Sequence, residues 1–257
     1  MSDDWPVADD SSKRCYDTAF EAMRKRLDGL RCERIGPHRL FLGDCREIMP
    51  LIGRVDALIT DPVWPNCPAG LCEGADDPVA LWSAAWRAMP PLIRAVVVMR
   101  YDSDPRFLAP VPMRYTRAVF LPYAIPSHIG RMLGGDEIAY CFGEPIPSRA
   151  GQRVIPGRAP PAQPARRSSR HPCPRAVEHF RFLVRWWSEP DETVLDPFAG
   201  SGTTGVAASQ LGRRFIGIEI DPGHFEEACE RIADAMRQPD LFIKLPCKQT
   251  VQEEFAL

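Results

Sequence analysis

The segment Thr193–Thr204 (TVLDPFAGSGTT) constrains the fold more than any other part of the sequence. Its first residues are β-branched or apolar and predict a short buried strand, which ends at Asp196 because the following proline has no N–H to donate. Gly200 and Gly202 allow a sharp turn and a close approach to a ligand, and a helix is expected at 206–211. Strand, turn and helix together predict a ligand crevice at the carboxyl edge of an α/β sheet.

The glycine spacing distinguishes this turn from two common phosphate-binding turns. The third glycine of the dinucleotide fingerprint is absent, as is the lysine of the phosphate loop. A second apolar strand, expected at 214–222, contains Glu219. It lies 23 residues after Asp196, about where a carboxylate meets ribose hydroxyls in nucleotide-binding α/β units. Two acids without a phosphate cradle suit a nucleoside that lacks phosphate, such as S-adenosyl-L-methionine. The alternative is a glycine turn that serves the fold alone.

Composition limits the remaining classes of function. The 257 residues are 45% hydrophobic and 26% charged, which is typical of a globular chain, and we expect one domain over 1–257. A net charge of −2 means that contacts with nucleic acid would be local. No apolar run reaches membrane length, and the acidic start is unlike a signal peptide. The nine cysteines are scattered, with only Cys67 and Cys72 close, which favours reduced thiols in a cytoplasmic enzyme and no metal site.

The rest of the chain alternates between predicted strands and helices, as in an α/β fold with a mostly parallel sheet flanked by helices. We expect a flexible leader at 1–14 and helices at 16–30, 45–52, 79–93, 176–187 and 222–236. We expect further strands at 38–45, 55–62, 95–99, 117–122 and 137–142, and a recognition loop at 124–135.

The strand at 55–62 is the second informative stretch. It ends in Asp61, Pro62, Val63 and Trp64. If this strand neighbours the one that ends at Asp196, then an acid and an aromatic side chain line the same crevice.

A break in composition follows at 145–170, which holds six prolines, six arginines and no acid. Such a segment cannot bury enough apolar surface to fold alone. It is either an idle linker or an arm or recognition loop that orders on nucleic acid through phosphate contacts. Its arginines, the predicted nucleic-acid-binding residues, are Arg149, Arg153, Arg158, Arg166, Arg167 and Arg170.

These segments together resemble the amino-group DNA methyltransferases, which modify adenine N6 or cytosine N4. Residues 196–203 (DPFAGSGT) are similar to their cofactor motif, and 61–64 (DPVW) to their catalytic D-P-P-[YWF] motif. Residues 171–175 (HPCPR) resemble their H-P-x-x-K-P segment, and 42–45 (LGDC) their L-x-G-D segment. The catalytic motif precedes the cofactor motif, which is the order of the permuted β group. The resemblance covers residues 38–238.

The resemblance implies a Rossmann-like, S-adenosylmethionine-dependent fold. It implies a site-specific enzyme that acts on double-stranded DNA as a monomer or homodimer. Such an enzyme moves a methyl group from S-adenosyl-L-methionine to the exocyclic amine of a flipped base, and an aspartate at the head of the catalytic motif favours adenine N6. The alternatives are a cytosine-N4 DNA methyltransferase, an adenine-N6 RNA methyltransferase and a catalytically silent nucleic-acid-binding subunit.

The resemblance also assigns catalytic roles. The Asp61 carboxylate and the Pro62 carbonyl would accept hydrogen bonds from the amine, and Trp64 would stack on the flipped base. Val63 stands where the family usually has a second proline, and Arg175 where it usually has lysine.

Cofactor contacts are implied in the same way. Glu219 would bind the ribose, Asp44 would lie near the adenine or the amino-acid end, Asp196 would contact the methionine ammonium, and Arg175 would pair with the carboxylate. The expected cofactor-binding set is Asp44, Cys45, Arg175, Asp196, Phe198, Ala199, Gly200, Ser201, Gly202, Thr203, Thr204 and Glu219.

Overall fold

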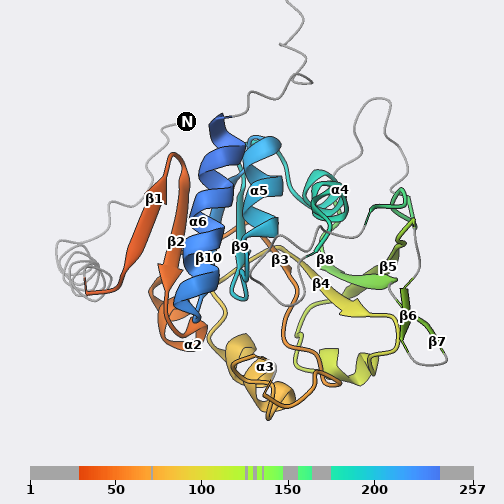
Figure 1. The fold of residues 1–257 in the computed structure, drawn as a ribbon. Helices are drawn as coiled ribbons and strands as arrows, with labels where there is room; N and C mark the ends of the chain where they lie inside the picture. Colours follow the sequence, from red (N-terminus) through yellow and green to blue (C-terminus); the bar gives the residue numbers. More distant parts are fainter. Residues whose placement is uncertain are drawn as a thin grey trace, which may run out of the picture.

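The computed structural model describes residues 29–70, 72–124, 127–129, 132–134, 136–146, 156–163 and 175–237. Its centre is an eight-stranded sheet (Figure 1) with the strand order β1-β2-β10-β9-β3-β4-β8-β5. The strands are β1 (Cys32–Ile35), β2 (His38–Leu42), β3 (Ala57–Thr60), β4 (Arg94–Arg100), β5 (Tyr115–Leu121), β8 (Glu137–Gly143), β9 (Thr193–Asp196) and β10 (Arg214–Glu219). A separate hairpin joins β6 (Ser127–Ile129) to β7 (Met132–Gly134).

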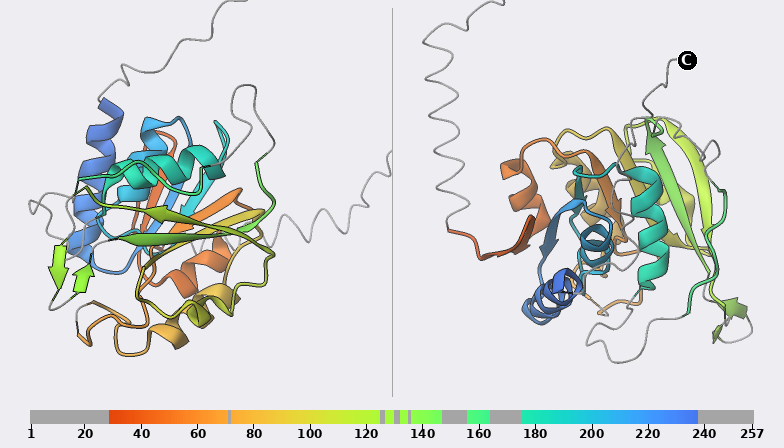
Figure 2. Two further views of the ribbon diagram at one scale, coloured as in Figure 1. Left: turned by 90° about the vertical axis from the view of Figure 1, so that its right-hand side faces the viewer. Right: turned by 90° about the horizontal axis from the view of Figure 1, so that it is seen from above.

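The five strands from β2 to β4 in this order are parallel, while β1, β8 and β5 pair antiparallel at the two sides. Helices cover both faces of the sheet (Figure 2). One face carries α2 (Cys45–Ile48) and α3 (Pro78–Arg87), and the other carries α4 (Val177–Trp187), α5 (Thr203–Gln210) and α6 (Pro222–Arg237). The predicted α/β architecture is confirmed. No helix in the described ranges is long and apolar enough to cross a membrane.

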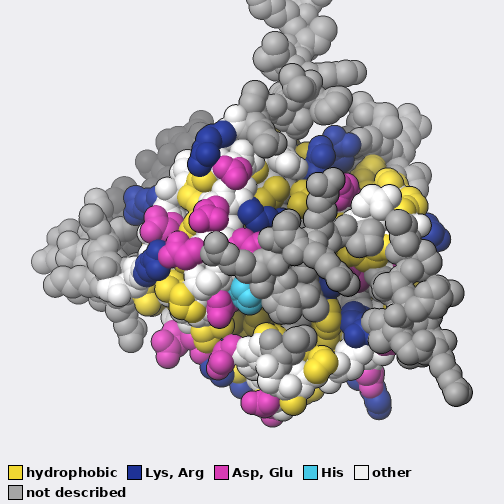
Figure 3. Space-filling model, viewed as in Figure 1, with side chains coloured by type: hydrophobic (Ala, Val, Ile, Leu, Met, Phe, Trp, Pro, Cys, Tyr) yellow, Lys and Arg dark blue, Asp and Glu magenta, His cyan; other side chains and the backbone are white. Residues whose placement is uncertain are grey.

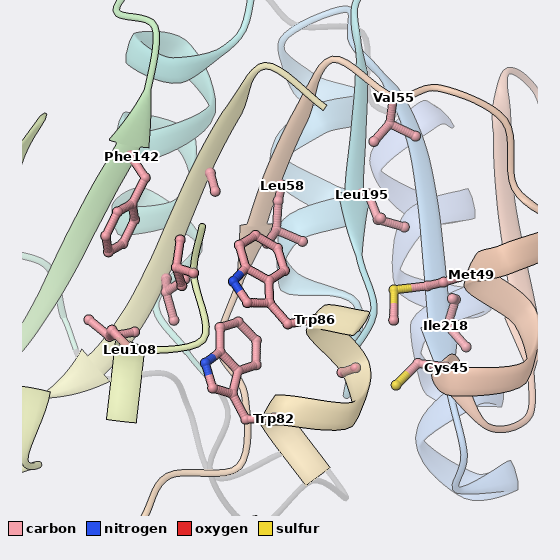
Figure 4. Packing of buried hydrophobic residues seen from close by; sticks show 14 of the residues in the cluster. Cys45, Met49, Val55, Leu58, Trp82, Trp86, Leu108, Phe142, Leu195 and Ile218 are labelled. Carbon is pink, nitrogen blue, oxygen red and sulfur yellow. The ribbon is translucent and has the colours of Figure 1, made fainter. Parts of the chain in front are cut away.

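The period of two along each central strand divides the buried side chains between two cores. In β3, Leu58 points to the layer under α2 and α3, whereas Ile59 points to the layer under α4 and α5. Figure 4 shows the first of these layers, in which Trp82 and Trp86 stack with ring centroids 5.6 Å apart beneath Leu58. The central strands β3 (ALIT) and β4 (RAVVVMR) are therefore buried along nearly their whole length, as expected for strands that are covered on both faces.

Most of the predicted elements are present, with several differences in their bounds. The recognition loop predicted at 124–135 holds the β6–β7 hairpin. The helix predicted at 79–93 ends at Arg87, because the prolines at 90 and 91 cannot continue it. The helix predicted at 206–211, with Thr203 and Thr204 opening it, runs from Thr203 to Gln210. The edge strand β1 was not predicted, since four residues with two charges give no clear alternation. The predicted leader at 1–14 and nearly all of the helix at 16–30 lie outside the described residues.

Part of the basic segment extends the sheet. Residues 156–163 run parallel to β5 and its continuation, with bridges from Phe120 to Arg158 and from Tyr123 to Ala162. The Ala159 amide donates to the Phe120 carbonyl at 2.8 Å, and both alanines of the segment are buried. These residues therefore take their backbone partners from the edge strand, and the role of the segment as a linker or as a nucleic-acid-contacting arm stays a prediction. Arg158 is exposed, and the other five arginines of the segment lie outside the described residues.

The connections on the two sides of β9 and β3 run in opposite directions. From β9 the chain passes through α5 to β10, and from β3 it passes through α3 to β4, on the other side of the sheet. The strand order therefore reverses between β9 and β3. At such a reversal the loops diverge and leave a crevice outside the carboxyl ends of the strands.

Helix α5 packs unusually close to β10 and α6, and the contact depends on a glycine. A Cβ at Gly205 would lie 2.4 Å from Ile232 Cδ1 and 2.7 Å from the Phe215 ring. We predict that Gly205→Ala lowers the free energy of unfolding by about 1–3 kcal/mol, although alanine favours the helix by about 1 kcal/mol. Urea unfolding measures it, and Ser209→Ala on the same helix is the control. A variant as stable as the wild type would contradict this packing.

Candidate active site

A cavity of about 890 Å³ opens at the carboxyl ends of β2, β3, β9 and β10. The pairing of β3 with β9 brings the Asp61 loop and the glycine loop to its two sides, as the sequence suggested. The predicted site residues that line it are Asp44, Cys45, Asp61, Pro62, Val63, Trp64, Arg175, Phe198, Gly200 and Glu219. The predicted residues that do not line it are Asp196, Ala199, Ser201, Gly202, Thr203 and Thr204.

Asp196 is buried beneath the cavity and acts within the fold. Its carboxylate accepts hydrogen bonds from Thr60 Oγ1 at 2.7 Å, Thr204 Oγ1 at 2.5 Å and the Phe198 amide at 3.1 Å. These bonds connect the end of β3, the glycine loop and the start of α5. The predicted contact of Asp196 with a methionine ammonium is therefore replaced by a structural role, because its side chain is directed into the protein.

The glycine loop is also fixed from α6. Arg231 Nη1 donates to the Ser201 carbonyl at 2.5 Å and to Ser201 Oγ at 2.7 Å. Gly202 has a left-handed backbone with φ of 79°, and a Cβ there would lie 2.8 Å from Ala228 Cβ. The loop is thus held on the side away from the cavity, which leaves Gly200 facing it.

Glu219 lies at the end of β10 with both carboxylate oxygens directed at the loops. Oε2 accepts from the Gly200 amide at 2.7 Å, and Oε1 accepts from the Asp221 amide at 2.9 Å. Burial raises the pKa of Glu219, and these two backbone hydrogen bonds oppose the rise. A carboxylate has about four acceptor sites, so two remain for the two hydroxyls of a ribose.

The loop after β2 contributes Asp44 and Cys45. The Asp44 carboxylate caps α2 by accepting from the Arg46 amide at 2.8 Å, and it also pairs with the Arg46 guanidinium. Its hydrogen bond to the Arg46 side chain lowers the pKa of Asp44. Burial raises the pKa of the Cys45 thiol to about 12, so it is protonated at neutral pH.

Asp61 is held by two donors. Trp64 Nε1 donates to Oδ1 at 2.8 Å, and Arg175 Nε donates to Oδ2 at 2.5 Å. The Arg175 guanidinium carbon lies 4.2 Å from the centroid of the Trp64 ring, so it stacks on one face of the indole. The acids that Arg175 contacts in the structure belong to the protein, which favours a role beside Asp61 over the expected pairing with the carboxylate of a cofactor.

The second of these acids, Glu137, was not predicted. Its Oε1 lies 2.8 Å from Arg175 Nη1, and Tyr123 donates to its Oε2 at 3.2 Å. Burial raises the pKa of Glu137 to about 7, against the nearby charge of Arg175. The only signal for Glu137 in the sequence was an acid at the start of an apolar strand. Glu137 lies at the site because β8 runs antiparallel to β4.

Another part of the cavity wall comes from the loop before α3 and the start of that helix. Cys67 and Cys72 lie on it with their sulfur atoms 4.0 Å apart, together with Glu73, Asp76 and Asp77. Among the described residues, no group of three or more His, Cys, Asp or Glu is arranged to hold a metal ion.

The buried Asp196 predicts a pH dependence of stability. Burial raises the pKa of Asp196 to about 7, although the hydrogen bonds from Thr204 and Thr60 lower it. The pKa of an aspartate in the unfolded chain is about 3.9. Unfolding therefore releases a proton between these values, and this contribution to stability is lost as the pH rises through that window.

We predict that Asp196→Asn flattens the decline in the free energy of unfolding from pH 5 to pH 7, by up to about 1.4 kcal/mol per pH unit. Urea titrations at pH 5, 6 and 7 measure the slope. Glu137 contributes in the same direction and is unchanged in the variant. An identical slope in both proteins would show that Asp196 is ionised throughout.

Comparisons with known proteins identify the family of the chain. The DNA methylase family model matches residues 82–230, more than half of the chain. YubD of Escherichia coli (strain K12) is 43% identical over 67 residues, which are 26% of this chain and 30% of YubD. The Type II methyltransferase M2.DpnII of Streptococcus pneumoniae is 37% identical over 65 residues, 25% of this chain and 24% of that protein. These two matches span less than a third of either relative.

Two solved structures share the fold over most of their length. The M1.HpyAVI–SAM complex has a TM-score of 0.61 at 21% identity and covers 76% of this chain and 98% of its own. The cytosine-N4-specific PvuII DNA methyltransferase has a TM-score of 0.58 at 16% identity, with coverage of 78% and 91%. Fold, strand-tip residues and the match to the family model lead to one conclusion: this chain belongs to the N6/N4 DNA methylase family.

Proposed function

We propose that this protein is a site-specific DNA methyltransferase that moves a methyl group from S-adenosyl-L-methionine to the N6 amine of a flipped adenine in double-stranded DNA. The observation that carries the proposal is that Asp61–Trp64, at the end of β3, and Glu219, at the end of β10, line the same cavity. Membership in the N6/N4 DNA methylase family and the likeness to a methyltransferase crystallised with SAM support the same reaction.

The cavity fits the proposed cofactor in size and chemistry. About 890 Å³ is within the usual range for small-molecule sites. Two free acceptor sites on Glu219 suit the ribose hydroxyls, and Gly200 brings backbone close to the ligand without a side chain. When bound, S-adenosylmethionine would supply an electrophilic methyl group on a positively charged sulfur. Asp44, Phe198 and Glu219 are the residues that we expect to hold it.

Asp61 is the proposed acceptor for the reacting amine. An exocyclic amine is a weak nucleophile because its lone pair is delocalised into the ring. Hydrogen bonds from the amine to the Asp61 carboxylate and to the Pro62 carbonyl would localise that lone pair. Asp61 already accepts two hydrogen bonds, and its remaining acceptor sites can serve the amine. It would stabilise the positive charge that develops on nitrogen and take up a proton after transfer.

The aromatic side chain of the catalytic motif has a more specific role than stacking alone. Trp64 is only 8% exposed, and one face of its ring is covered by Arg175. Its indole N–H orients Asp61. We propose that Trp64 first fixes the carboxylate, and that the flipped base meets the side of the ring away from Arg175.

DNA is expected to approach away from α6. Acidic side chains gather over that helix on the face in view (Figure 3). The exposed residues of α6 include Glu230 and Asp234. These charges would repel a phosphate backbone. Arg158, exposed beside the sheet edge at β5, belongs to the basic segment that we propose contacts phosphates.

The direct test is transfer of labelled methyl from S-adenosylmethionine to unmethylated duplex DNA, with mass analysis of the nucleosides. N6-methyladenine is the expected product. N4-methylcytosine as the product would support methyl transfer to an exocyclic amine but show that the base is cytosine and not adenine. Methylation of structured RNA instead of DNA would overturn the substrate, and cofactor binding without transfer to either would favour a silent binding subunit.

We predict that Asp61→Ala abolishes transfer, with a loss of at least about a thousandfold, because the amine loses its acceptor. The affinity for S-adenosylmethionine should change by no more than a few-fold, since Asp61 stands on the acceptor side of the cavity. Isothermal titration and single-turnover assays measure the two quantities. A large loss of cofactor binding would place Asp61 in the cofactor site and contradict the assignment.

We predict the opposite result for Glu219→Ala, a large effect on cofactor affinity and a small one on the transfer rate. The cofactor should bind about tenfold or more weakly, because two charge-assisted hydrogen bonds to the ribose are lost. The transfer rate at saturating cofactor should fall much less. Glu226→Ala, a nearby carboxylate on α6 that does not line the cavity, is the control. Unchanged cofactor affinity in Glu219→Ala would contradict the ribose assignment.

A further inference from the structure

The catalytic carboxylate is connected to a buried charge network that the proposed reaction does not require by itself. Arg175 lies between two acids, with Nε 2.5 Å from Asp61 Oδ2 and Nη1 2.8 Å from Glu137 Oε1. The side chains are 14%, 17% and 3% exposed for Arg175, Asp61 and Glu137, respectively. Little water therefore screens these charges.

The three residues come from segments far apart in the sequence. Asp61 follows β3, Arg175 precedes α4, and Glu137 begins β8. Because β8 runs antiparallel to β4 and pairs Glu137 with Arg100 at the end of β4, the start of β8 lies at the same edge as the parallel strand tips. The antiparallel strand β8 therefore places Glu137, a second acid, at the site.

The planar guanidinium is suited to this bridge. Its donors point outward in a fixed fork, so one arginine can bind two carboxylates at a set angle. Glu137 is anchored in turn by Tyr123, which donates to its other oxygen. The face of Arg175 rests on the Trp64 ring, and Trp64 donates to Asp61 Oδ1, the oxygen that Arg175 does not bind. Asp61, Arg175 and Trp64 therefore each contact the other two.

We infer that Arg175 and Glu137 are positioning residues that hold the Asp61 carboxylate and the Trp64 ring in the geometry needed to receive the amine. This inference rests on the proposed function. Glu137 fixes the direction of Arg175 and balances its charge, and Arg175 fixes one oxygen of Asp61. This role requires no contact with the cofactor from either residue.

Three variants separate this role from a structural one or a cofactor-binding one. Glu137→Gln keeps the shape and removes the charge, Arg175→Gln removes the bridge, and Arg175→Lys keeps the charge without the fork. Glu192→Gln is the matched control, because Glu192 forms a buried pair with Arg94 at 2.6 Å before β9, at the far end of the sheet. Each variant is measured for thermal stability, S-adenosylmethionine affinity and single-turnover transfer at saturating cofactor.

We expect Arg175→Gln to lower the transfer rate about a hundredfold and Glu137→Gln about tenfold, with cofactor affinity within about threefold. Arg175→Lys should recover part of the loss, and Glu137→Gln should add nothing to Arg175→Gln. Glu192→Gln should lose stability but no rate. The inference is overturned if Arg175→Gln weakens cofactor binding with an unchanged rate, or if Glu137→Gln transfers as fast as the wild type. If Glu137→Gln does not fold, the comparison of Arg175→Gln with Arg175→Lys decides.

A second readout separates this inference from the proposed function. The indole N–H resonance of Trp64, identified by its loss in Trp64→Phe, reports the hydrogen bond to Asp61 without any reaction. It should shift in Arg175→Gln and Glu137→Gln and stay in place in Glu192→Gln. If the wild-type protein transfers no methyl group, the proposed function is wrong. If the Trp64 resonance does not move in Arg175→Gln and Glu137→Gln, the positioning role of Arg175 and Glu137 is wrong.

Discussion

The pairing of β3 with β9 is the contact on which the rest of the site depends. It is short, with Ala57 opposite Val194 and Leu58 opposite Leu195, and beyond it Thr60 donates to Asp196 at 2.7 Å. Strand order reverses at this seam, so the loops that follow the two strands turn away from each other and leave the cavity between them. A one-residue change of register would exchange the two buried faces and rotate Asp61 away from the glycine loop.

Buried charge is the second constraint, and it is placed at one edge of the sheet. Asp196 and Glu219 each receive hydrogen bonds from the loops that they organise, which offsets part of the cost of burial. Glu137 and Asp61 share Arg175. A hydrophobic replacement could stabilise such a position as well or better. We therefore infer that these acids mainly fix the geometry of the loops and of the Asp61 carboxylate, and that their effect on stability is secondary.

The sequence predicted the mostly parallel sheet, the two loops that meet at the cavity and ten of the residues that line it, because apolar runs, glycines and strand-terminal acids are local signals. It failed where the answer depends on pairing between distant segments. Asp196 was expected to face the ligand, but the approach of Thr60 and Thr204 directs it inward. Arg175 was expected at the cofactor, but the antiparallel β8 brings Glu137 beside it. Residues 156–163 were expected not to fold alone, and no local signal in the sequence indicated that their backbone partners belong to the edge at β5.

The central claim is that the cavity divides into a cofactor side at Glu219 and a base side at Asp61. A crystal structure of the protein with S-adenosylmethionine tests it most directly. The account predicts ribose hydroxyls within hydrogen-bonding distance of Glu219 and a sulfonium methyl group directed toward Asp61, with Arg175 still bound to Asp61. A cofactor whose carboxylate has drawn Arg175 away from Asp61, or whose ribose lies elsewhere, would contradict it.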